Sequence, residues 1–293
     1  MLRILLFLCT NMAVMLIFGL ILSLTSISAN SFYGLIIISG LFGFGGSIIS
    51  LFMSKWIALY SVNGKLITTP INNTEIWLVS IIRQYSNKIG IKTPEIAIYP
   101  SHNINAFATG VGKHSSLIAV SHGLLDQMTS NEIEAIIAHE ISHISNGDMI
   151  TMTLVQGIMN TMVMFTSRAI AKIISSDHTN NKNDNGFNEN SLTYYIVSIV
   201  LDLLFGTLAN LIILWFSRYR EFHADAGAAI LSGKHNMIQA LKKLKNNCEP
   251  EEPNYIRTFC IYGKSNSIWN LFNTHPSLDE RITALHNNTY IST

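Results

Sequence analysis

Long uncharged stretches dominate the first part of the chain. Between Arg3 and Lys55 there is no charged residue, and such a run is too long for one membrane span of about 20 residues. A cluster of Thr, Ser and Asn at 25–33 interrupts it. The pattern predicts two transmembrane helices, at 4–25 and 33–54. The first could also be a signal peptide, but a second span follows directly, which favours a retained anchor.

Two further apolar runs follow later in the chain. Residues 149–171 contain a single charge, Arg168, and residues 191–217 contain a single charge, Asp202. The polar, Asn-rich segment 177–190 separates them, so the pair predicts a helical hairpin that crosses the membrane. Charged groups at membrane depth are either paired or functional. We expect an ion pair between the two hairpin helices, with a transport role as the alternative.

These runs divide the chain into four parts. They are an N-terminal pair of transmembrane helices (1–54), a polar segment (55–148), the hairpin (149–217) and a second polar segment (218–293). Basic residues gather on one side of the four predicted spans, and that side is expected to be cytoplasmic. They are Arg3, Lys55, Lys65, Arg218 and Arg220. Both termini and both polar segments are therefore expected inside the cell.

Composition agrees with a membrane protein and excludes some functions. Charged residues make up 13% of the chain, against about 25% in ordinary soluble domains. The net charge of +1 provides no strong field to attract nucleic acid, so we expect no nucleic-acid partner. The three cysteines are few and lack metal-ligand spacing, which favours reduced, inert thiols.

The segment 130–146 contains the candidate metal ligands and the candidate catalytic base. Thr129 followed by Glu132 is a capping-box signature, and isoleucines recur at helical spacing after it, so a helix is predicted. On that helix His139 and His143 are separated by one turn and share a face. Two imidazoles so placed can bind one metal ion, and Glu140 beside them can act on a metal-bound water. The alternative is an amphipathic helix with two partly buried histidines.

A catalytic zinc site needs a third protein ligand. After the last apolar run, Glu221 and Asp225 are again separated by one helical turn. Glu221 could complete a His-His-Glu site, and Asp225 could accept the free ring N–H of a ligand histidine. His223 is an alternative third ligand. Because the ligands adjoin the predicted hairpin, the metal should lie within about 10 Å of the cytoplasmic membrane face at about 1.5 Å per residue.

With these motifs the chain resembles the HtpX family of bacterial membrane metalloproteases over essentially its whole length. The resemblance implies one zinc ion per chain, bound by His139, His143 and Glu221, with Glu140 as the catalytic base. It also implies that Asn105, Ala106 and Phe107 lie beside the substrate cleft. The implied fold is an α-rich multi-pass membrane protein with a cytoplasmic α+β, zincin-like (gluzincin) catalytic domain.

The C-terminal part contains His275-Pro276 followed by Arg281, which resembles a further element of that family. His275 could donate a hydrogen bond to the oxyanion that develops at the scissile carbonyl. A helix start is the competing interpretation, since Ser277 can cap the residues that follow. Arg281 either holds this segment to the site or is a solvated helix charge.

Three shorter elements complete the predicted catalytic domain. Residues 70–88 should form a helix that ends at Gly90, and residues 96–99 and 117–121 should form strands. Residues 105–109 lie between the strands. One of these stretches is expected to be an edge strand that pairs with an extended substrate; an interior strand with a surface turn is the alternative.

The sequence therefore predicts a zinc endopeptidase of the bacterial inner membrane. Its expected substrates are membrane or misfolded proteins, and its expected role is protein quality control under stress, both on the strength of the resemblance. Specific processing of a lipid-anchored or signal-type substrate is one alternative. A membrane scaffold with a structural zinc is another, and Glu140 argues against it because a structural site needs no base.

Overall fold

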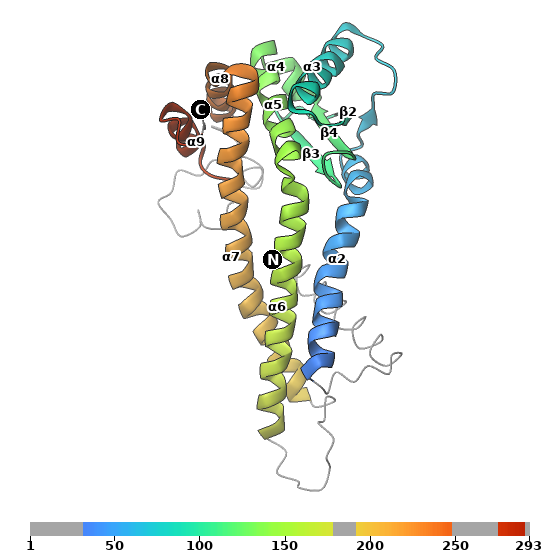
Figure 1. Cartoon of the computed structure of the whole chain (residues 1–293), viewed down its shortest axis with the longest axis vertical. Coiled ribbons are helices and arrows are strands. Elements are labelled where there is room, and N and C mark those ends of the chain that lie inside the picture. The colour runs from blue at the N-terminus through green and yellow to red at the C-terminus, as the bar shows by residue number, and fades with distance from the viewer. Residues whose placement is uncertain (1–31, 178–191, 248–274, 291–293) are drawn as a thin grey trace. The chain divides into compact units, whose positions relative to one another are not determined.

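The computed structural model describes residues 32–177, 192–247 and 275–290. The predicted span at 4–25 lies outside these residues, as does the predicted loop at 177–190 except for Asp177. The described elements, in chain order, are α2 (Phe32–Ser61), β1 (Lys65–Leu66), α3 (Asn73–Ile89), β2 (Glu95–Tyr99), β3 (Ala106–Gly110), β4 (Ser116–Ser121), α4 (His122–Gln127), α5 (Ser130–Asn146), α6 (Asp148–Asp177), α7 (Leu192–Ala228), η1 (Ala229–Gly233), α8 (Lys234–Asn247) and α9 (Leu278–His286) (Figure 1).

Three of these helices, α2, α6 and α7, are long and apolar enough to cross a membrane. Helices α2 and α6 cover the predicted runs at 33–54 and 149–171 and extend beyond them at both ends. Helix α7 covers the predicted run at 191–217 from Leu192 onward and extends beyond its C-terminal end. The apolar side chains of the three helices are largely exposed in the chain itself, which suits a lipid environment. Helix α7 continues through the π-helical turn η1 into α8.

The chain forms two compact units. Among the described residues, the helical unit comprises residues 32–48, 154–177 and 192–212, and the mixed unit comprises residues 49–153, 213–247 and 275–290. The boundary falls within the long helices, so the two parts are continuous along the backbone. Each unit has its own packing and is described separately.

Two close contacts hold the helical unit together. A Cβ atom on Gly43 of α2 would lie 2.2 Å from Thr161 Oγ1 of α6, so glycine is what permits this close helix approach. Arg168 of α6 forms an ion pair with Asp202 of α7 at 3.1 Å, and both residues are buried. This confirms the predicted pairing between the hairpin helices.

The mixed unit contains a four-stranded sheet in the order β1-β2-β4-β3. Strands β2 and β4 run parallel, while β1 and β3 lie antiparallel at the two edges. The predicted strands at 96–99 and 117–121 are the interior ones. The segment after Asn105 is β3, an edge strand, so its predicted edge position is confirmed and the surface-turn alternative is wrong. Its pairing with a substrate stays a prediction.

Alternating side chains of the sheet pack on opposite sides. Ile96, Ile118 and Val120 join the main core with helices α3, α5 and α8. The intervening residues form a second cluster that packs against the end of α2; they are Ala97, Tyr99, Leu117 and Ala119. This period of two is what an extended strand imposes. One face of the sheet therefore supports α5, the helix with the histidines.

Helix α5 has the predicted bounds, and its ends are well defined. The capping box between Thr129 and Glu132 is present. Gly147 ends the helix with φ of 73°, a left-handed conformation that favours glycine. Helix α3 ends at Gly90 as predicted but begins at Asn73, because the Asn72 side chain accepts from the Glu75 N–H and caps it there.

Candidate metal centre

Helix α5 places two imidazoles next to each other, one turn apart, in an edge-to-face arrangement. His139 Nε2 lies 3.1 Å from His143 Nε2, and the ring planes are nearly perpendicular, at 88°. His139 is buried against the core, while His143 is partly exposed. The spacing of one turn thus brings one nitrogen from each ring to a common point.

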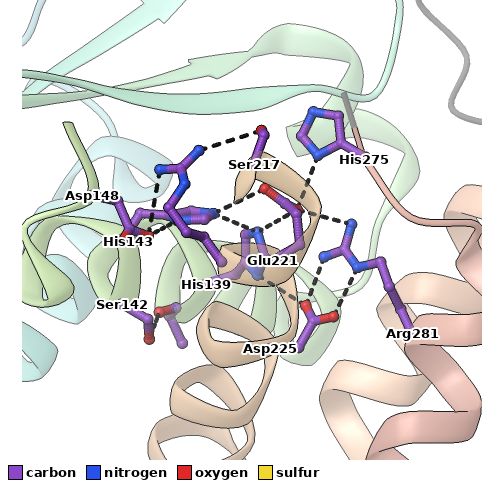
Figure 2. Close-up of polar contacts among 11 residues, drawn as sticks. His139, Ser142, His143, Asp148, Ser217, Glu221, Asp225, His275 and Arg281 are labelled. Carbon is purple, nitrogen blue, oxygen red and sulfur yellow. Dashed lines mark hydrogen bonds and ion pairs between the residues drawn. The ribbon is translucent and has the colours of Figure 1, made fainter. Parts of the chain in front are cut away.

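Helix α7 brings a carboxylate to the same point. Glu221 Oε1 lies 3.4 Å from His143 Nε2, and Glu221 Oε2 lies 3.6 Å from His139 Nε2. One donor atom from each of the three residues lies within 4.8 Å of the other two, and Figure 2 shows the three side chains converging. Two imidazole nitrogens and a carboxylate oxygen are the donors that a catalytic zinc site uses.

His223, the alternative third ligand, points elsewhere. Its ring centroid lies 4.7 Å from that of Tyr219 and 5.1 Å from that of Tyr290. On a helix, two residues separated by two positions face different directions. The geometry therefore brings Glu221, and not His223, to the histidine pair.

Asp225 and Arg281 support the buried side of this group. Asp225 Oδ1 lies 3.0 Å from His139 Nδ1, as expected for a carboxylate that orients a ligand histidine. Arg281 of α9 donates to both Asp225 oxygens, at 2.6 and 2.7 Å, and its Nη1 lies 3.4 Å from Glu221 Oε2. Arg281 is 4% exposed, so the alternative of a solvated helix charge is wrong.

His275 lies at the outer edge of the group. Its Nδ1 is 2.9 Å from Glu221 Oε2, and its side chain is 39% exposed. Ser277 caps α9 and forms a capping box with Glu280. The segment is thus a helix start and also brings His275 to Glu221; the oxyanion role of His275 stays a prediction. Because Nδ1 faces Glu221, a contact between His275 and a substrate would have to use the other ring nitrogen, Nε2.

Glu140 lies between the histidines and the sheet edge. It is partly exposed, and the backbone N–H of Ala108 in β3 donates to its carboxylate. Burial raises the pKa of the Glu140 carboxyl above its ordinary value, against the lowering effect of His139 and His143. The edge strand is therefore directly beside the candidate base.

The predicted cleft residues fall at the start of this edge strand. The Asn105 N–H donates to Ser121 Oγ at 3.0 Å, which fixes the entry to β3. Ala106 packs on the α5 side of the sheet, whereas Phe107 packs on the opposite side, 5.8 Å from the Tyr99 ring. Backbone groups of this strand, more than the Phe107 side chain, face the candidate centre.

Sequence reasoning missed two residues of the site. Asp148, the first residue of α6, places Oδ2 2.5 Å from His143 Nδ1. Arg220 Nη1 lies 3.7 Å from the same oxygen. The sequence did contain a signal for Asp148, because the glycine that ends α5, Gly147, is followed immediately by this carboxylate. The contact with Arg220 depends on how α7 packs and has no local signal.

The charges around the centre suit a divalent cation. With neutral histidines, four carboxylates face two guanidinium groups, which leaves two negative charges uncompensated in a largely buried place. The carboxylates are Glu140, Asp148, Glu221 and Asp225, and the guanidinium groups are Arg220 and Arg281. A dication bound by the His-His-Glu group would balance them. The residues present therefore fit a metal such as zinc.

Comparison with known proteins agrees with this geometry. A sequence model described as "Peptidase family M48" matches residues 72–289. The chain is 58% identical over 291 residues to "Protease HtpX" of Buchnera aphidicola subsp. Baizongia pistaciae, covering 99% of this chain and 100% of the relative. It is 56% identical over 292 residues to the protein of that name from Pectobacterium carotovorum subsp. carotovorum, again covering 99% and 100%.

A solved structure shows the same fold. The crystal structure of S. mikatae Ste24p aligns with a TM-score of 0.64 and 22% sequence identity. The alignment covers 97% of this chain but 64% of the Ste24p chain. At this identity the likeness concerns the fold alone.

Proposed function

Since this chain belongs to peptidase family M48 and is a membrane metalloprotease, we propose that it is a zinc endopeptidase of the bacterial inner membrane. The single observation that carries the proposal is the convergence of His139, His143 and Glu221 beside Glu140. One zinc ion per chain would be held by these three side chains. When bound, zinc polarises the scissile carbonyl and lowers the pKa of a water molecule.

Glu140 performs the proton transfers in the proposed reaction. Its carboxylate takes a proton from the attacking water and then delivers that proton to the leaving amine, first as base and then as acid. The N–H of Ala108 orients the carboxylate. No covalent intermediate with the enzyme is required.

Substrate binding is assigned to the edge of β3 that no other strand among the described residues pairs with. An extended peptide laid along an edge strand forms backbone hydrogen bonds that need no particular side-chain sequence. Asn105 precedes this strand, Ala106 and Phe107 begin it, and Ala108 places it beside Glu140. In its imidazolium form, with the Nδ1 proton directed to Glu221, His275 would donate from Nε2 to the developing oxyanion. These roles suit a protease that cleaves many unfolded substrates.

Location near the membrane is supported by two exposed aromatic pairs. Trp56 stacks on Tyr60 in α2, and Trp215 stacks on Tyr219 in α7, with interplanar angles of 13° and 15°. Trp and Tyr are enriched where a helix crosses the membrane–water boundary. Because Glu221 follows two residues after Tyr219, at about 1.5 Å per residue the metal centre would lie within about 10 Å of the bilayer.

The basic residues beside the predicted spans favour a cytoplasmic location for both termini and for the mixed unit. A site so placed suits membrane-anchored and misfolded membrane proteins, and hence quality control. Depth can be tested with single-tryptophan variants in vesicles that contain brominated lipid. Trp56 and Trp215 should be strongly quenched and Trp77 of α3 weakly. Weak quenching of Trp215 would contradict the placement.

The mechanism is tested by Glu140→Gln in full-length protein, purified without metal and then loaded with zinc. The variant should bind zinc like the wild type and cleave a membrane-protein substrate at least about 100-fold more slowly, as expected on losing a general base. Glu134→Gln is the matched control, because Glu134 lies on the same helix and accepts from the Tyr85 hydroxyl at 3.0 Å. Zinc-dependent cleavage by Glu140→Gln at the wild-type rate would overturn the mechanism.

A further inference from the structure

Each histidine of the candidate metal centre contacts a carboxylate, and that carboxylate in turn contacts a guanidinium group. The first line runs from His139 through Asp225 to Arg281. The second runs from His143 through Asp148 to Arg220. These three residues lie on α5, α6 and α7, respectively. The structure thus contains two His-Asp-Arg lines that meet at the same point from two sides.

Local backbone geometry places Asp148 in the second line. Gly147 adopts a left-handed conformation, and its N–H donates to the His143 and Ile144 carbonyls at the end of α5. The chain then begins α6 at once, so that Asp148 is in the first turn of a helix. A carboxylate is stabilised there by the N-terminal end of the helix dipole. The start of α6 therefore places the Asp148 carboxylate beside His143.

Arg220 connects this carboxylate to the helix of the third candidate ligand. It immediately precedes Glu221 on α7, and its Nη2 lies 3.4 Å from Ser217 Oγ. Its Nη1 lies 3.7 Å from Asp148 Oδ2, the oxygen that contacts His143 Nδ1. One oxygen thus faces both the histidine on α5 and the arginine on α7.

We propose that Asp148, supported by Arg220, is a positioning residue that fixes the ring orientation and tautomer of His143 for metal binding. An acceptor at Nδ1 keeps the proton on that nitrogen and leaves Nε2 free as a ligand. The proposal rests on the proposed metal centre and adds two residues to it. It also assigns a role to the immediate succession of α5 and α6, because a longer connection would move Asp148 away from His143.

The two lines differ in strength, and this gives an expected ranking. Arg281 makes two short hydrogen bonds to Asp225 and is buried. Arg220 has one longer contact to Asp148, and its side chain is 16% exposed. In the second line the contact of Asp148 with His143, at 2.5 Å, is shorter than its contact with Arg220. Changes at Asp148 should therefore affect metal binding more than changes at Arg220.

The test is the zinc affinity of full-length variants in detergent, measured by competition with a chromophoric chelator. Asp148→Ala should lower zinc affinity about 100-fold and Asp148→Asn about 10-fold, the range seen when such partners of a metal ligand are removed. Asparagine loses less because its amide oxygen still accepts from Nδ1. Arg220→Gln should lower affinity by a smaller factor, about 3-fold, since it acts through Asp148.

Two controls remove charge without touching the centre. Glu75→Gln removes a first-turn carboxylate from α3, where Glu75 accepts from the Ile71 N–H. Arg83→Gln removes an exposed guanidinium from the same helix. Both should bind zinc like the wild type. A general loss of stability is detected separately by thermal unfolding of the metal-free proteins, in which Asp148→Asn should melt close to the wild type.

The outcomes separate this inference from the proposed function. Absence of zinc binding by the wild type would remove the metal centre itself. Zinc binding by the wild type and, within twofold, by Asp148→Asn would overturn the role of Asp148 and leave the metal centre intact. If Asp148→Ala does not fold, Asp148→Asn decides alone. The cobalt-substituted proteins provide a second readout, because a misoriented His143 should shift the visible spectrum of the folded Asp148 variant.

Discussion

The guanidinium group of Arg281 donates hydrogen bonds to both carboxylate oxygens of Asp225, at 2.6 and 2.7 Å. This pair attaches the C-terminal helix α9 to α7, the helix that carries Glu221. It also fixes the carboxylate that faces His139. A segment more than 50 residues away in sequence therefore completes the surroundings of the candidate metal centre.

Loss of Arg281 should destabilise the mixed unit. Arg281→Ala leaves Asp225 buried without its partner, and removing one member of a buried pair typically costs about 3–5 kcal/mol. Arg281→Lys should be intermediate, because an ammonium group cannot reproduce the two-pronged contact. Thermal unfolding of the metal-free protein measures the effect. Arg83→Gln is the control, and equal melting of Arg281→Ala and this control would contradict the expectation.

The choice between Glu221 and His223 can be tested directly. Glu221→Gln should lower zinc affinity by about 100-fold or more, because a neutral amide is a poor replacement for a charged ligand. His223→Ala should leave zinc affinity unchanged, since its ring packs against Tyr219 and Tyr290. Chelator competition measures both variants. The reverse order of effects would identify His223 as the ligand.

His275 is expected to act on the transition state. His275→Ala should lower kcat about 100- to 1,000-fold, the usual effect of losing one oxyanion donor. KM should change little, because the contact forms in the transition state and not with bound substrate. His286→Ala, an exposed residue of α9, is the control. A raised KM with unchanged kcat would assign His275 to substrate binding.

The ion pair between Arg168 and Asp202 should show strong coupling in stability. Each single change to leucine leaves one charge buried in the helical unit and should destabilise it by about 3–5 kcal/mol. The double variant should lose much less than the sum, since no unpaired charge remains. Unfolding in lipid nanodiscs measures the cycle. Additive effects, or single variants as stable as the wild type, would disprove the pairing role.

The sequence by itself determined the features that depend on short spacing. His139 and His143 are separated by one helical turn, and the capping box of Thr129 and Glu132 marks where their helix begins. The same reasoning placed Glu221 and Asp225 on one face of a later helix. Long uncharged runs identified α2, α6 and α7, because a bilayer requires about 20 apolar residues to cross it.

The tertiary structure decided what depends on packing between elements. The sequence left open whether Glu221 or His223 faces the histidines, since the rotation of α7 about its axis is set by the helices that contact it. It could not show that β3 is the edge strand, because strand order arises from pairing across the chain. The contact of Arg220 with Asp148 has the same origin. Periodicity specifies which residues share a face, but only packing specifies what that face meets.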